Sequence, residues 1–66
     1  AVYKIVEVVG SRPTSFENAA RSAVEAAAKT LRDLRVAEVT KLDMKIENGK
    51  VVAFRARVSM SFKYEG

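Results

Sequence analysis

The 66-residue sequence contains no cysteine and no histidine. Without cysteine, disulfide bonds and thiolate metal sites are excluded, and without histidine the commonest zinc and copper ligand is missing as well. A chain of this size buries only about 60% of the surface that its unfolded form exposes, and small scaffolds usually need such cross-links, a metal or partner subunits. The remaining routes to stability are an unusually well-packed core and association with further copies of the same chain.

The sequence also lacks a run of about 18 apolar residues that could span a membrane. Its first ten residues, AVYKIVEVVG, lack the basic and apolar regions of a signal peptide. We therefore expect a soluble, cytoplasmic protein with no membrane partner. The net charge of +4 favours anionic ligands, but the charges are spread along the chain without a basic block, which is more typical of a solvated surface.

The first half of the chain predicts a strand followed by a helix. Residues 2–9, VYKIVEVV, are rich in β-branched residues and predict a strand, which a turn at 10–13 then ends. Thr14 is the first candidate for the helix N-cap, with Ser15 as the alternative, because Glu17 has the spacing of a capping box. Apolar residues at helical spacing then extend the predicted helix to about Leu34.

The second half predicts a β-hairpin. Residues 36–47 form a strand with a bulge or bend near 38–41, where the alternation of apolar residues is broken. Asn48-Gly49 is a strong hairpin signal, and residues 51–64 alternate between apolar and polar side chains over a third strand. The predicted fold is α+β, with β-α-β-β order in a single domain of residues 1–66 and a three-stranded antiparallel sheet wrapped around one helix.

The two faces of this sheet differ in polarity. We expect the helix to cover the apolar side of the third strand together with Leu42, Met44 and Ile46. The opposite face carries charged and hydroxyl side chains, among them Arg55 and Arg57. One helix cannot cover both faces, and exposed strand edges are usually paired or blocked, so self-association is expected.

Enzymatic and nucleic-acid-binding functions are not supported by the sequence. No histidine or cysteine is present as base or nucleophile, and the carboxylates, lysines and serines form no catalytic motif. Asp43 and Glu47 share a strand face but lie about 13 Å apart, too far to bind one ion within a chain. No metal site is therefore predicted within one chain, and ion binding by several copies that meet at a symmetry axis is left open. Phe54, Phe62 and Tyr64 fall on the core side of the sheet, whereas nucleic-acid binding needs aromatics beside the basic residues.

The chain resembles the dodecin family over nearly its whole length. The stretches that carry the resemblance are VYKIVEVVGSRPTSFENAARSAV, KTLRDLRVAEV and IENGKVVAFRARVSMSF, in family order. The resemblance implies a β-α-β-β protomer, twelve copies of which build a hollow homododecamer. Typical members bind riboflavin, FMN or FAD in pairs at two-fold axes and store or sequester them. Others are similar in binding coenzyme A or ions, or bind no flavin.

Three positions match the flavin site of the family, and all three are substituted. The tryptophan that stacks on the flavin ring corresponds to Val36, the glutamine at the ring edge corresponds to Arg55, and an often acidic or histidine position corresponds to Lys45. Val36 has no aromatic face, and Arg55 has hydrogen-bond donors only, which suit a phosphate or carboxylate better than a ring edge. Alternatively, Val36 is an ordinary strand residue. Arg55 and Arg57 are then solvated, or they pair with Asp43, Glu47 or Glu38 within the sheet or across subunits.

The sequence thus predicts a non-enzymatic, shell-forming, small-ligand-binding or storage protein of dodecin type with a degraded flavin site. No cofactor is firmly predicted, and weak binding of FMN or riboflavin is left open. The alternative is a working flavin store, and a third reading is an assembly that binds an anion such as coenzyme A, or a metal ion. The expected partners are further copies of the chain and a small anionic ligand, without nucleic acid.

Overall fold

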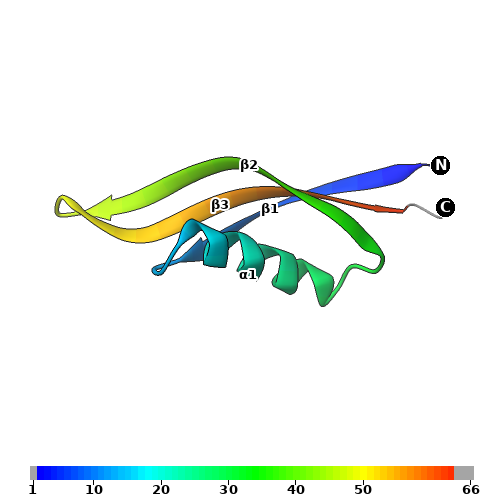
Figure 1. The fold of residues 1–66 in the computed structure, drawn as a ribbon, viewed down its shortest axis with the longest axis horizontal. Coiled ribbons are helices and arrows are strands. Elements are labelled where there is room, and N and C mark those ends of the chain that lie inside the picture. Colours follow the sequence, from blue (N-terminus) through cyan, green and yellow to red (C-terminus); the bar gives the residue numbers. More distant parts are fainter. Residues whose placement is uncertain (1, 64–66) are drawn as a thin grey trace.

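The computed structural model describes residues 2–63, which form one helix beside a three-stranded sheet (Figure 1). The elements are β1 (Tyr3–Arg12), α1 (Phe16–Ala28), β2 (Leu34–Glu47) and β3 (Lys50–Lys63). The expected β-α-β-β order and the α+β class are confirmed. Tyr64, the expected last residue of the third strand, lies outside the described residues. Among residues 2–63, no helix is long and apolar enough to cross a membrane.

The sheet is antiparallel, with β3 at its centre and the strand order β1-β3-β2. The β2–β3 hairpin turns at Asn48 and Gly49, which adopt φ angles of 53° and 73°, and Glu47 pairs with Lys50 across the turn. Positive φ at both central residues is the geometry that an Asn-Gly hairpin favours. The register shifts between Val39 and Lys41, which confirms the expected bulge. Further shifts near both ends of β2 were not expected from the sequence.

Strand β1 is longer than the sequence pattern predicts, because the residues taken for a turn continue the ladder. Gly10, Ser11 and Arg12 pair with the successive β3 residues Ala56, Arg55 and Phe54. Gly10 also lies against the helix, where a Cβ atom would be only 2.0 Å from the carbonyl oxygen of Ala19. Glycine at this position is therefore a consequence of close helix–sheet packing rather than of a turn.

The helix begins one residue later and ends six residues earlier than we expect from the sequence. Ser15 is the N-cap, because its side chain accepts a hydrogen bond from the Asn18 backbone N–H. The prediction of Thr14 as first choice was wrong. The helix ends at Ala28, and a short connection with Asp33 at a φ of 59° leads into β2, so the predicted extension to Leu34 was also wrong.

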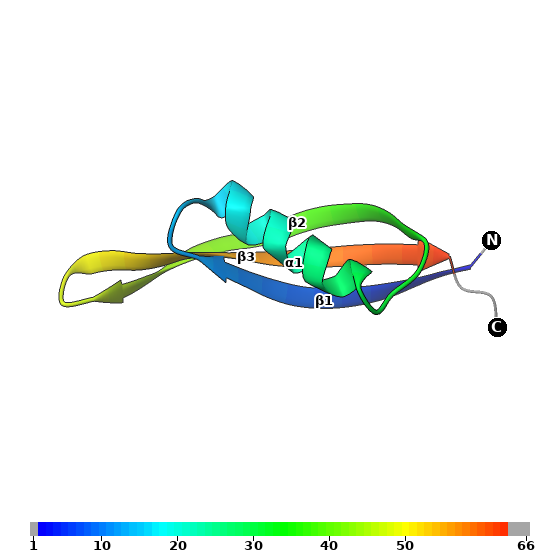
Figure 2. The ribbon, with the colours of Figure 1, turned by 90° about the horizontal axis from the view of Figure 1, so that it is seen from below.

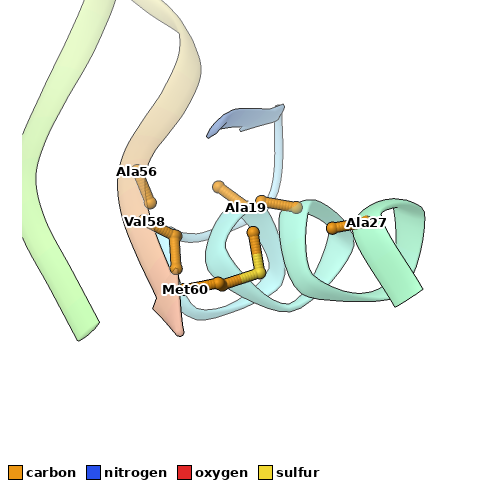
Figure 3. Close-up of a cluster of buried hydrophobic side chains, with 6 residues drawn as sticks. Ala19, Ala27, Ala56, Val58 and Met60 are labelled. Carbon is orange, nitrogen blue, oxygen red and sulfur yellow. The ribbon is translucent and has the colours of Figure 1, made fainter. Parts of the chain in front are cut away.

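The buried core is small and consists mostly of alanine from the helix and apolar residues from β3. Its members with less than a tenth of their surface exposed are Ala19, Ala23, Ala27, Ala56, Val58 and Met60. Val58 and Met60 point towards the helix from the central strand (Figure 3). The even side of β3 is the core side, as the alternation predicts.

The expectation that the helix covers Leu42, Met44 and Ile46 was wrong. These residues are 54%, 48% and 61% exposed, and the β2–β3 hairpin projects past the helix as an arm (residues 42–54; Figures 1 and 2). A 13-residue helix spans about 20 Å, whereas a 14-residue strand spans about 46 Å. The helix therefore packs mainly on β1 and β3 and leaves most of the hairpin arm uncovered. At the base of the arm, the ring of Phe54 packs edge-to-face on Phe16, the first residue of the helix.

Candidate functional site

The sheet face that points away from α1, here called the open face, carries a pair of oppositely charged side chains at the base of the hairpin arm. Asp43 of β2 lies directly opposite Arg55 of β3 in the register. Arg55 Nε donates to Asp43 Oδ1 at 2.6 Å, and Arg55 Nη2 donates to Asp43 Oδ2 at 2.8 Å. Both carboxylate oxygens and one edge of the guanidinium are thus engaged, in the bidentate geometry that is the strongest form of this contact.

This pairing changes the protonation equilibria of both groups. The hydrogen bonds from Arg55 are the largest effect and lower the pKa of Asp43 below its ordinary value of 3.8. Desolvation, the next largest effect, raises this pKa, and the weaker effects of the charges of Arg55 and Arg57 lower it. The hydrogen bond to Asp43 likewise raises the pKa of Arg55. Asp43 is therefore ionised at neutral pH and acts as a hydrogen-bond acceptor rather than as a proton donor.

Two further ion pairs lie around this centre. Arg57 Nε is 3.7 Å from Glu7 Oε1 of β1, and Lys45 Nζ is 3.5 Å from Glu47 Oε2. The interpretation of Arg55 as one half of an ion pair within the sheet is confirmed, and Asp43 is its partner among the three carboxylates considered. The Glu7 partner was missed, because it depends on β1 lying beside β3, and the strand order was not part of the prediction.

The structure brings together two of the three positions that the sequence resemblance assigns to the family's flavin site and separates the third. Lys45 pairs with Ala53, two residues along β3 from Arg55, so both lie at the base of the hairpin arm. Val36 pairs with Ser61, six residues from Arg55, which corresponds to about 20 Å along the strand. A ligand that touched both Val36 and Arg55 would need to span this distance or to lie between two chains.

Val36 itself lines a shallow cavity of about 120 Å³ near the start of β2. The walls include Val24 of the helix and Met60 of β3, with Arg35 as the charged group. Val36 is 63% exposed and offers an aliphatic surface there, with no ring on which a planar ligand could stack. The cavity is smaller than the roughly 300 Å³ at the lower end of the usual range for small-molecule sites.

The described residues do not assemble a metal centre within one chain. Among residues 2–63, no three histidine, cysteine or acidic side chains lie close enough to hold an ion. Both Asp43 oxygens accept hydrogen bonds from Arg55, and Glu47 lies beside Lys45. A cation bound here would have to displace these pairs or draw its ligands from more than one subunit.

Comparison with known proteins gives one family. A family model described as Dodecin matches residues 2–65. A calcium dodecin from Mycobacterium tuberculosis is 38% identical over 63 residues, which is 96% of this chain and 89% of the relative. Its crystal structure, described as having a novel calcium-binding site, superposes with a TM-score of 0.86 and 39% identity, covering 98% of this chain and 93% of that one.

Structural similarity extends to other dodecins. The dodecin of Streptomyces coelicolor has a TM-score of 0.92 and 37% identity, covering 98% of this chain and 93% of that chain. A mutant of the dodecin from T. thermophilus has a TM-score of 0.90 and 34% identity, covering 98% and 97%. Sequence, fold and element order therefore agree over the full length of the described residues, and the chain belongs to the dodecin family.

Proposed function

We propose that this chain is a non-enzymatic, ligand-binding or storage protein of dodecin type in which the flavin site is degraded. The observation that carries the proposal is the bidentate contact between Arg55 and Asp43. At the position where flavin-binding relatives present an amide to the ring edge, this chain has a guanidinium that is already engaged and that offers no acceptor. Val36 adds no aromatic surface, so the stacking contact of about 0.5–1.5 kcal/mol per ring pair is absent.

A titration with riboflavin by equilibrium dialysis tests this proposal. Dialysis measures bound flavin directly, whereas quenching by an indole would not report binding to this chain, which contains no tryptophan. The unmodified protein is expected to bind little riboflavin at micromolar concentration. The double variant Val36→Trp, Arg55→Gln should bind several-fold more tightly, since about 1 kcal/mol of stacking corresponds to about a fivefold change in affinity.

The matched control for this titration is Val36→Leu with Arg55→Gln, which removes the guanidinium but adds no aromatic ring. This control should remain close to the wild type if stacking is the missing contribution. Tight riboflavin binding by the unmodified protein would contradict the proposal and favour the alternative, a working flavin store that uses other contacts. Lys45 remains in all three proteins, so its effect on the pocket cancels in the comparison.

We further propose that the functional form is a homododecamer. Several observations support self-association. Residues 2–63 contain only six buried hydrophobic residues, the hairpin arm exposes Leu42, Met44 and Ile46, and β1 and β2 are both edge strands. Exposed edges and apolar patches of this kind are usually covered by partners. Multi-angle light scattering should report about 88 kDa, twelve chains of 7.3 kDa each, and a stable monomer or dimer across concentrations would contradict the proposal.

Calcium is a second candidate ligand, because a 38% identical relative is a calcium dodecin. The described part of the chain has no three-carboxylate cluster, so a calcium site would have to combine groups from several subunits. Calorimetric titration of the assembled protein with calcium chloride distinguishes the two candidates. Saturable binding with fewer than one ion per chain would support a shared site, whereas no heat of binding would leave an organic ligand as the better candidate.

A further inference from the structure

A second cavity lies on the other side of the molecule from the open face, between the end of β1 and the first turns of α1. Its volume is about 340 Å³, within the range of about 300–1,000 Å³ that is typical of small-molecule sites. None of Val36, Lys45 and Arg55 lines it. The cavity is therefore separate from the positions that match the flavin site of the family.

Two arginines supply positive charge to this cavity, here called the helix-start cavity. Arg12, the last residue of β1, lines the wall and has no ion-pair partner among residues 2–63. Arg21 lines the same cavity and is held by Glu17, one turn earlier in the helix, at 2.9 Å. Glu25 is the carboxylate among the lining residues. Arg12 thus contributes a guanidinium whose donors are available to a ligand.

Uncharged donors lie next to Arg12. The Thr14 hydroxyl oxygen accepts a hydrogen bond from Asn18 Nδ2 at 2.8 Å, so its own hydrogen is free to donate, and the Asn18 amide retains a second N–H. The Ser22 hydroxyl donates to the Ala19 carbonyl oxygen and is left as an acceptor. The donors on the wall therefore gather around Arg12, Thr14 and Asn18, and the acceptors lie at Ser22 and Glu25.

We propose that the helix-start cavity binds a small phosphate-bearing molecule. The guanidinium of Arg12 matches two phosphate oxygens in bidentate geometry, and the hydroxyl of Thr14 and the amide of Asn18 donate to the others. Arg21 adds a second guanidinium to the same wall, and Glu17 partly neutralises its charge. Glu25 and Ser22, as acceptors, bind a hydroxyl or amine on the same molecule, so a phosphate monoester of a polyol fits better than a bare dianion.

Calorimetric titration of the assembled protein at low ionic strength tests this site, with glycerol phosphate as the probe and sodium acetate as the comparison anion. Saturation at one phosphate per chain is expected, with little binding of acetate. Arg12→Gln should weaken phosphate binding about tenfold or more, because a hydrogen-bonded charge is lost. Thr14→Val, which removes one donor and leaves the Ser15 cap in place, should weaken it several-fold.

The matched control is Arg32→Gln, since Arg32 lies in the exposed connection between α1 and β2 and its substitution removes the same charge. This control should keep the affinity within about twofold of the wild type. Equal weakening by Arg12→Gln and Arg32→Gln would mean a general charge effect and would overturn the proposal. The absence of saturable binding would also overturn the proposal. A change of subunit count in Arg12→Gln, measured by light scattering, would overturn it as well, because the cavity would then be an assembly contact. Neither outcome depends on the riboflavin titration.

Discussion

Gly10→Ala is the substitution whose effect follows most directly from the structure. The added Cβ would lie 2.0 Å from the carbonyl oxygen of Ala19 and 3.0 Å from the Cβ of Ala23. Ordinary contact begins at 3.4 Å, so the helix backbone would have to move by about 1.4 Å relative to β1. The obstructing atom belongs to the backbone and cannot turn aside as a flexible side chain could.

The size of the effect follows from the cost of overpacking. Inserting one methyl group into a well-packed core costs about 1–3 kcal/mol, and we expect the upper end, about 3 kcal/mol, because backbone must move. Folded domains gain only about 0.05–0.15 kcal/mol per residue, so this is a large share of the stability of a 66-residue chain. Moving the helix would also displace the wall of the helix-start cavity.

Urea unfolding followed by far-ultraviolet circular dichroism, at one fixed chain concentration, measures this loss. Gly49→Ala is the matched control, because its Cβ would meet nothing within 4 Å and only its φ of 73° is unfavourable, which costs about 1–2 kcal/mol. If Gly10→Ala lost no more stability than Gly49→Ala, the close helix–sheet packing described above would be wrong.

Two other predictions concern the open face and the helix cap. Because the pKa of Asp43 is lowered on folding, its contribution to stability is present above the ordinary value of 3.8 and is lost as the pH falls through the lower folded value. The urea midpoint of the wild type should therefore fall more steeply than that of Asp43→Asn between about pH 5 and about pH 2, and parallel curves would contradict this. Ser15→Ala should reduce the unfolding free energy by about 1 kcal/mol in the same urea titration. Thr14→Ala should reduce it less, because the Thr14 hydroxyl contacts only the Asn18 side chain. The reverse order would mean that the cap is misassigned.

The sequence was sufficient for the order of the elements, because strand alternation and the Asn48-Gly49 turn are local signals. It was also sufficient for the core side of β3, where apolar and polar residues alternate without interruption. It failed at the ends of β1 and α1. Glycine is typical of turns, but Gly10 lies within β1 and is needed for close packing against the helix. Leu34 continues the apolar spacing of the helix, although it begins β2.

The candidate site was predictable only where it depends on one hairpin. Arg55 and Asp43 lie opposite each other on the two strands of one hairpin, which a two-residue turn joins. Their pairing therefore follows from the register of that hairpin. The pair of Arg57 with Glu7 joins residues 50 positions apart, and the cavity beside Arg12 forms only when the helix lies back on β1. Neither depends on a local pattern, so neither could be found from the spacing of residues.

The hairpin arm has two chemically different sides. Leu42 and Met44 lie on the side shared with Ala56 and Phe54, since these residues pair in the register, while Asp43 and Arg55 hold the reverse side. A neighbouring chain with an apolar surface can accept this arm in one orientation only, because turning it over would remove a charged pair from water. The arm therefore presents one of its sides to an apolar neighbour and keeps the other for water.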